Sequence, residues 1–146
     1  MEGKIRHLEM IKGAIDGASS NSLRVEGFAI LLLIGTVALL LRDGVRTDVI
    51  PFLFGVVLIL IVAFLFLLDF YFIRQSSLFK ILYNQVRLLP EDEVDFSMEV
   101  EQYSDELNEQ YKEFPPFQLV ASGVIHLCII LLLFFGMLPP QLVMIS

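Results

Sequence analysis

Long runs of hydrophobic residues alternate along this chain with amphipathic and charged stretches. The runs cover residues 23–41, 51–73 and 117–138. A helix of about 20 apolar residues crosses a hydrocarbon core about 30 Å thick, so each run is long enough to span a membrane. Prolines precede the second run and flank the third, which favours helix boundaries there. We therefore predict an all-α membrane protein with three transmembrane helices.

An amphipathic pattern precedes the first run and another follows the second. Within 1–20, apolar residues recur at steps of three and four, which is typical of one face of an amphipathic helix; they are Ile5, Leu8, Ile11 and Ile15. The polar segment 18–22 should break that helix before the first span. Apolar residues in 74–89 keep the helical spacing, and no glycine or proline interrupts 56–89. We expect the second span to continue as a helix into the cytoplasm.

An acidic stretch separates the second and third runs. Residues 91–113 contain ten acids and one lysine and carry a net charge of −9, against −7 for the whole chain. Apolar residues within it are spaced as on one face of a helix; they are Phe96, Val100, Tyr103, Leu107 and Tyr111. We predict an acidic cytoplasmic helix over 90–114, with a solvated charged linker as the alternative. A short tail, 139–146, ends the chain.

Composition and charge support a membrane location. Hydrophobic residues make up 56% of the chain and the mean hydropathy is +0.74, whereas soluble domains are about half apolar. The first apolar run follows about 26 mixed residues, so we expect a retained span instead of a cleaved signal. Lys and Arg gather before the first span and after the second, which predicts a cytoplasmic N-terminus and an external C-terminus. One cysteine, Cys128, allows no disulfide within the chain.

Polar residues within the runs are candidates for function. Asp69 lies 18 residues beyond Pro51, about 27 Å along a helix, so it falls near the cytoplasmic interface. It could form a boundary or structural ion pair with a cation from another helix or subunit, or it could line a cytoplasmic pore mouth or gate. His126 lies about 12 Å beyond Gln118, with Ser122 one turn before it on the same face. These two could form hydrogen bonds between helices or line a pore.

Cationic residues near the spans form a second candidate site. They could bind anionic lipid headgroups, or several subunits could gather them around a nucleotide; they are Arg6, Lys12, Arg24, Arg74, Lys80 and Arg87. No catalytic motif, metal-ligand set or cofactor motif is present, so we expect neither an enzyme nor a cofactor. We expect no binding to duplex nucleic acid.

Three strings resemble a family of small prokaryotic membrane proteins that includes the Hailong-type effectors, which are encoded beside nucleotidyltransferases in anti-phage defence. The strings are HLEMIKGAIDGASSNSLRVEGFAI (7–30), LLDFYFIRQSSLFKILYNQVR (67–87) and EVDFSMEV (93–100). The resemblance implies a homo-oligomeric helical channel in the prokaryotic inner membrane, controlled by a nucleotide or oligonucleotide that the nucleotidyltransferase makes. Phe28 replaces a tryptophan common in the family, and Ser76 with Ser77 replace an acidic-basic pair.

Two functions from different classes fit these features. The first is a gated pore or ion channel acting in abortive infection. Three helices cannot enclose an aqueous path, so this function requires a ring of subunits. The alternative is a non-conducting adaptor that anchors a cytoplasmic partner through the acidic helix. A secondary transporter fits less well, because the spans lack a carboxylate at mid-membrane and broken helices.

Overall fold

Helices make up most of the described chain. The computed structural model describes residues 2–41, 50–113 and 116–137, and within them it contains no strand. The α-helices are α1 (Glu2–Leu41), α2 (Ile50–Leu88), α3 (Ser104–Glu113) and α4 (Phe117–Met137), and two 3₁₀ turns, η1 (Glu91–Glu93) and η2 (Glu101–Tyr103), lie between α2 and α3. The predicted all-helical class is confirmed for these residues. The tail 139–146 lies outside them.

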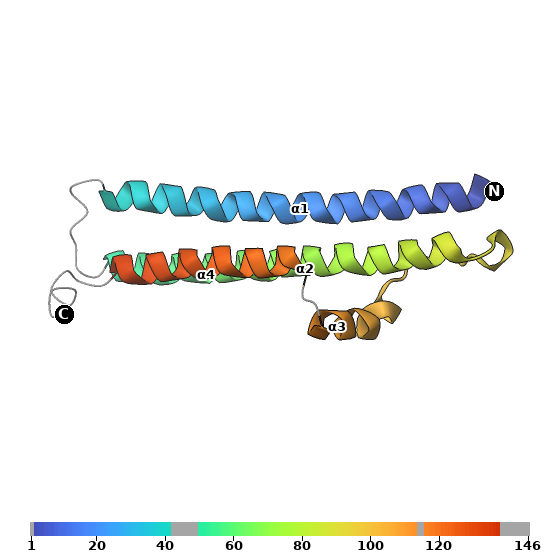
Figure 1. Ribbon diagram of the computed structural model, residues 1–146. Helices are drawn as coiled ribbons and strands as arrows, with labels where there is room; N and C mark the ends of the chain where they lie inside the picture. Colours follow the sequence, from blue (N-terminus) through green and yellow to red (C-terminus); the bar gives the residue numbers. More distant parts are fainter. Residues whose placement is uncertain (1, 42–49, 114–115, 138–146) are drawn as a thin grey trace.

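Two long antiparallel helices, α1 and α2, form the body of the molecule (Figure 1). They lie side by side along their length, and α4 packs against the first half of α2. α1 and α4 barely touch each other, so α2 is the central helix. The second predicted span and its extension form this one helix.

α1 runs without interruption through the segment where the sequence predicts a break. Its 40 residues extend about 60 Å at the usual helical rise, roughly twice a hydrocarbon thickness. Serine often caps a helix because its hydroxyl competes for backbone donors. Here Ser19 bonds to Ser76 and Ser22 bonds to Asp69, both on α2. These contacts between helices use the hydroxyls and leave the backbone helical.

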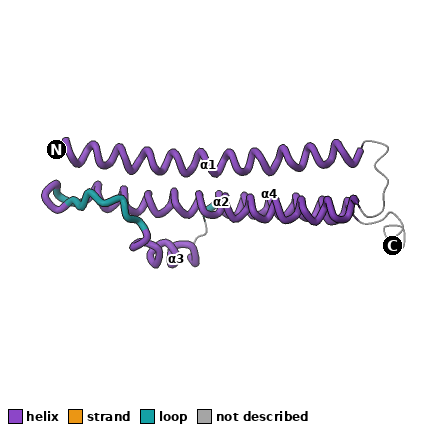
Figure 2. Tube along the Cα trace, turned by 180° about the vertical axis from the view of Figure 1, so that it is seen from behind, coloured by secondary structure: helices purple, strands orange, loops and turns teal. Residues whose placement is uncertain are grey.

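The acidic segment is helical only in its last part, so the helix predicted over 90–114 is wrong for its first half. α3 begins at Ser104, and residues 94–100 contain no helical turn. The Asp95 side chain accepts a bond from the Ser97 backbone N–H at 3.0 Å, and the Ser97 hydroxyl accepts one from that of Glu99 at 3.1 Å. Such local bonds stabilise turns in competition with a helix. Figure 2 shows this segment as a loop that follows η1.

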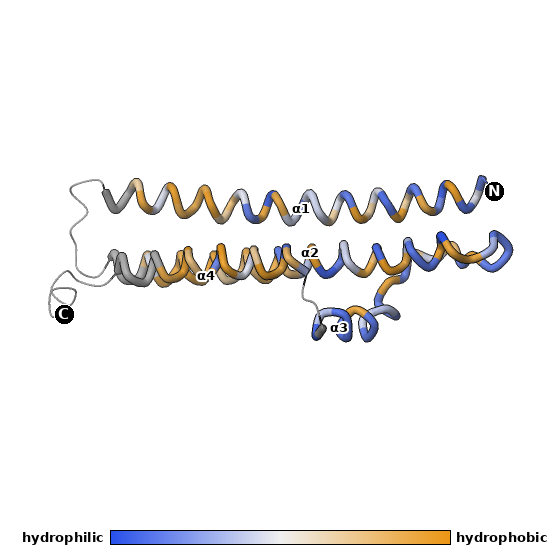
Figure 3. The backbone as a smooth tube through the Cα atoms, viewed as in Figure 1, coloured by the Kyte–Doolittle hydropathy of each residue, from blue (hydrophilic) through white to orange (hydrophobic). Residues whose placement is uncertain are grey.

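The two ends of the long helices differ in hydropathy (Figure 3). Apolar residues dominate the half that contains α4, whereas polar residues are frequent towards the start of α1, the end of α2 and α3. We call these the apolar half and the polar half. Residues 2–38 of α1 and 54–88 of α2 are long and apolar enough to cross a membrane, which indicates membrane association. The described part of α4 meets this criterion only together with α3, to which it is bent by 74°.

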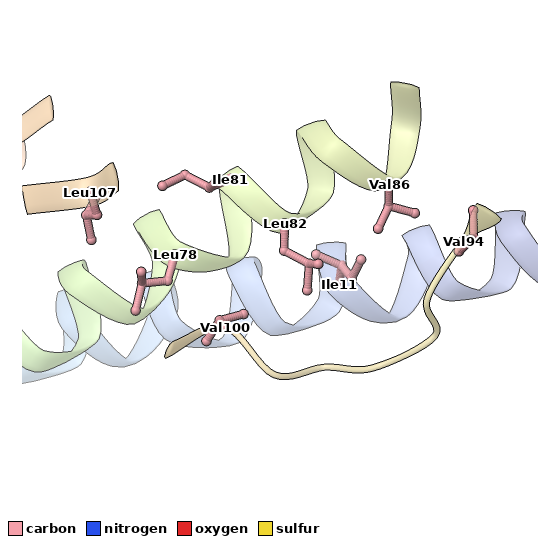
Figure 4. Packing of buried hydrophobic residues seen from close by; sticks show 8 residues of the cluster. All are labelled: Ile11, Leu78, Ile81, Leu82, Val86, Val94, Val100 and Leu107. Atoms are coloured by element: carbon pink, nitrogen blue, oxygen red, sulfur yellow. The ribbon is translucent and has the colours of Figure 1, made fainter. Parts of the chain in front are cut away.

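Each half has its own hydrophobic core. In the apolar half, Ala29, Leu58, Val62 and Ile129 are buried between α1, α2 and α4. The core of the polar half is built from α1, α2, α3 and the loop 94–100 (Figure 4). Its buried side chains are Ile11, Leu78, Ile81, Leu82, Val86, Val94, Val100 and Leu107. The second core attaches the acidic segment to the long helices.

The core of the polar half predicts a large effect of one truncation in α3. Leu107 is 1% exposed, so Leu107→Ala should lower the free energy of unfolding by about 2–5 kcal/mol through lost burial and a cavity. Leu88→Ala, at a position that is 77% exposed, should change it by less than about 0.5 kcal/mol. Denaturant-induced loss of helical circular dichroism in detergent micelles measures both variants. Equal effects would show that α3 does not pack as described.

Candidate functional site

Asp69 lies at the contact between α1, α2 and α4. Its side chain is completely buried, and both carboxylate oxygens accept hydrogen bonds. The Ser22 hydroxyl of α1 donates to Oδ1, and the Ser122 hydroxyl of α4 donates to Oδ2. A buried carboxylate without partners costs several kcal/mol, whereas each hydrogen bond to a charged group returns about 1.5–3 kcal/mol. We call Ser22, Asp69 and Ser122 the polar lock.

The sequence identified two members of the polar lock and missed the third. Asp69 and Ser122 were singled out because they interrupt apolar runs. Ser22 was interpreted as a helix cap because it stands in a polar segment just before a run. Among the residues that the structure describes, no cation forms an ion pair with Asp69. Its partners there are hydroxyl groups of two other helices, so hydrogen bonds stand in place of the ion pair that the sequence suggested.

His126 extends the polar lock along α4. Its Nδ1 lies 2.9 Å from the Ser122 carbonyl oxygen and donates to it, since a carbonyl can only accept. The ring is 2% exposed and packs at a tilt against Phe66, with centroids 5.4 Å apart. Nε2 is buried and has no hydrogen-bond partner.

A small cavity adjoins the polar lock. Its volume is about 70 Å³, and it lies between α1, α2 and the start of α4. The lining residues are Ser19, Ser22, Leu23, Glu26, Ile73, Ser76 and Gln118. Ser22 thus contacts the cavity and also donates to Asp69, so it links the two features.

The predicted cationic set divides into two groups. The Arg74 guanidinium donates to the Glu101 carboxylate at 3.2 Å and to the Ser104 hydroxyl at 3.0 Å, so it joins α2 to the start of α3. The other five side chains are exposed, and the described part of the chain pairs none of them with an acid; they are Arg6, Lys12, Arg24, Lys80 and Arg87. Within one protomer, Arg74 is therefore engaged and the others are available.

Two further residues connect the start of α1 with segments far along the chain, Lys4 with the end of α2 and His7 with the loop 94–100. The Lys4 ammonium donates to the carbonyl of Arg87 at 3.1 Å and to that of Leu89 at 2.5 Å, which satisfies acceptors that a helix end leaves free. His7 is buried with its ring against Phe96. Sequence spacing carried no signal for either contact, because the partners lie more than 80 positions away.

The arrangement contains no group suited to transition metals in the described ranges, because nowhere there do three His, Cys, Asp or Glu side chains converge. No family model, curated protein or solved structure matches the chain. Function must therefore be argued from the polar lock, the cavity and the exposed cations.

The polar lock predicts a cost for removing either hydroxyl. Ser22→Ala and Ser122→Ala should each lower the free energy of unfolding by about 1.5–3 kcal/mol, because a buried carboxylate oxygen loses its donor. Ser20→Ala is the matched control, since Ser20 is exposed on the same helix as Ser22. Unfolding in detergent micelles by added denaturant measures all three variants. A loss no larger than that of Ser20→Ala would contradict the polar lock.

The contact between Arg74 and Glu101 predicts a pH dependence. The Arg74 hydrogen bond, with help from Ser104, holds the pKa of Glu101 below its ordinary value of 4.5. Because this pKa is lower in the folded chain than in the unfolded chain, the ionised carboxylate stabilises the folded state above pH 4.5. That contribution is lost as the pH falls through the folded value.

We therefore expect acidification below pH 4.5 to loosen the attachment of residues 101–113 to α2. Hydrogen exchange of this segment, corrected for the intrinsic effect of pH, measures the change. Glu101→Gln should weaken the attachment at neutral pH and reduce its response to acid, whereas Glu99→Gln, at a nearby exposed position, should behave like the wild type. An unchanged acid response in Glu101→Gln would assign the effect to other carboxylates.

Proposed function

We propose that this protein is an oligomeric membrane effector that forms a gated pore, and that the polar lock holds the closed form. The observation that carries the proposal is the carboxylate of Asp69, which is buried without a cation and held by hydroxyls from two other helices. A buried polar group of this kind is expensive and is a frequent mark of an ion path or gate in membrane proteins.

The distribution of polar groups in the apolar half supports a closed state. Most exposed side chains there are apolar and suit contact with lipid; they include Phe28, Leu31 and Ile34 on α1, Leu60, Phe64 and Leu67 on α2, and Val124, Leu127 and Leu131 on α4. Asp69, Ser122 and His126 face inwards. An aqueous path therefore requires the helices to separate at the polar lock, which would expose these three residues to water.

A ring of subunits is part of the proposal, with α4 as the third span. One protomer has too few helices to surround water, and polar surface in a membrane must face water or protein. In this assembly 23–41, 51–73 and 117–138 cross the prokaryotic inner membrane, with the N-terminus in the cytoplasm and the C-terminus outside. The amphipathic start of α1, the end of α2 and α3 then form a cytoplasmic collar.

A nucleotide signal is the proposed control. The five exposed cations lie on α1 and α2, where α1 also contributes Ser22 and α2 contributes Asp69. A polyanion that bound them in one arrangement of the helices more tightly than in the other would shift the gate. The resemblance to Hailong-type effectors agrees with this control and with a role in abortive infection, and an anionic lipid surface is the competing ligand.

The acidic segment favours one alternative function. Side chains such as Glu99, Asp105 and Glu106 are exposed, while Val100 and Leu107 hold the segment against the long helices. An acidic surface fixed in this way could anchor a basic cytoplasmic partner. In this alternative the protein conducts no ions.

Ion flux from liposomes containing the purified full chain tests the pore. We expect flux that changes with a short adenine-based oligonucleotide or a cyclic nucleotide. Asp69→Asn should raise the basal flux about tenfold. A neutral amide accepts weaker hydrogen bonds than a carboxylate, so the closed form should lose about 1.4 kcal/mol of stability relative to the open form. Asp16→Asn, at an exposed position of α1, should leave the flux unchanged.

Substitutions in α4 locate the path. Ser122→Leu should change the flux, whereas Val124→Leu, at a position 55% exposed on the same helix, should not. His126→Leu tests the imidazole in the same assay. If protein that is inserted and helical conducts nothing under any of these conditions, the pore is wrong and the adaptor becomes the better proposal.

A further inference from the structure

The cavity beside the polar lock has a lining rich in oxygen atoms. Of its lining residues, Ser19, Ser22, Glu26, Ser76 and Gln118 carry side-chain oxygens, and none is a lysine, arginine or histidine. The two apolar members are Leu23 and Ile73. Ser22 and Ser76 are more than nine-tenths buried, so their oxygens are held inside the helix contact.

The hydrogen atoms of these hydroxyls are largely used. Ser22 donates its hydrogen to Asp69 and keeps only lone pairs free. Ser19 and Ser76 lie with their oxygens 3.0 Å apart, so one of the two donates to the other. The Glu26 carboxylate can only accept. The cavity therefore offers more acceptors than donors and is suited to an occupant that brings positive charge or hydrogen atoms.

The charges around the cavity are also unbalanced. Glu26 lines it, and Asp69 lies directly behind the Ser22 hydroxyl. In the described chain no Lys or Arg forms an ion pair with either carboxylate. Glu26 interacts electrostatically with Asp69 of α2 and with His126 of α4. Carboxylates that are partly shielded from water require a positive charge nearby.

We propose that this cavity binds a monovalent alkali cation, with Na⁺ as the best fit. A volume of about 70 Å³ accommodates a small ion together with water molecules. Ca²⁺ takes six to eight oxygens, usually from several carboxylates, and a single lining carboxylate does not supply them. Serine hydroxyls and one carboxylate supply oxygen ligands with a charge that a single positive ion balances.

The cation adds a ligand to the proposed gate. It would bridge Ser22 and Glu26 of α1, Ser76 of α2 and Gln118 of α4, and so favour the form in which these helices are in contact. The inference deepens the proposed function. Its test measures binding to the folded chain and not flux, so either proposal can fail without the other.

The thermal unfolding midpoint of the full chain in detergent micelles, at one pH and constant ionic strength, is the first measurement. A ligand that binds only the folded state raises this midpoint with its concentration. We expect a midpoint several degrees higher in NaCl than in choline chloride, since methyl groups surround the charge of choline and keep the oxygen ligands away from it. A higher midpoint in KCl supports the alkali site with K⁺ as the ion. Equal midpoints in NaCl, KCl and choline chloride overturn the proposal.

Matched variants then locate the binding site. Glu26→Gln should abolish the difference between NaCl and choline chloride, whereas Glu9→Gln, at an exposed position of the same helix, should retain it. Ser76→Ala, a smaller change, should weaken the binding of Na⁺ about tenfold, because the site loses one oxygen ligand. This variant decides the matter if Glu26→Gln does not fold. The site would be refuted if the ion-specific shift of the midpoint remained unchanged in both Glu26→Gln and Ser76→Ala. If Glu26→Gln does not fold, an unchanged shift in Ser76→Ala alone would refute it.

Discussion

The hydrogen bonds to Asp69 govern the arrangement of the apolar half. A carboxylate on α2 is enclosed where water is excluded, and it needs donors that its own helix does not supply. Ser22 reaches it from α1 and Ser122 from α4, one for each oxygen. The apolar packing in the core that contains Ala29 and Val62 is favourable but non-directional. The polar lock therefore determines how α1 and α4 are positioned along the axis of α2.

The polar lock also lies where the two halves of the molecule join. One hydrophobic core includes Val62 and Ile129, and the other includes Leu78 and Ile11. Because α1 and α2 pass through the junction without a break, a shift of either helix in the polar half would move Ser22 relative to Asp69. In the proposed gate, this continuity would connect the exposed cations to the buried carboxylate.

Stability alone does not explain a carboxylate at this position. Replacing a buried charged network by well-packed apolar residues is often neutral or stabilising, so Asp69 is a costly way to join three helices. The cost has a use if the contact must open, since a carboxylate exposed to water regains its hydration while a leucine would resist exposure. The adjoining cavity and the unpartnered Nε2 of His126 supply further polar groups at the same level.

Much of the architecture follows from local patterns in the sequence. Apolar periodicity indicated helices over most of the chain, and Pro51 and Pro116 marked where α2 and α4 begin, because proline suits the start of a helix. These inferences succeeded because helical rise and proline geometry depend on a few neighbouring residues.

The tertiary structure decided what local preference left open or predicted incorrectly. The segment around Ser22 favours a helix break, yet α1 continues because the hydroxyl donates to Asp69, 47 positions away. The segment around Ser97 fits a helical stripe, yet side-chain bonds to the backbone hold a loop that lets Val94 and Val100 reach the core. Which hydroxyl meets which carboxylate depends on the rotation and register of packed helices, and these are set by contacts between residues distant in the chain.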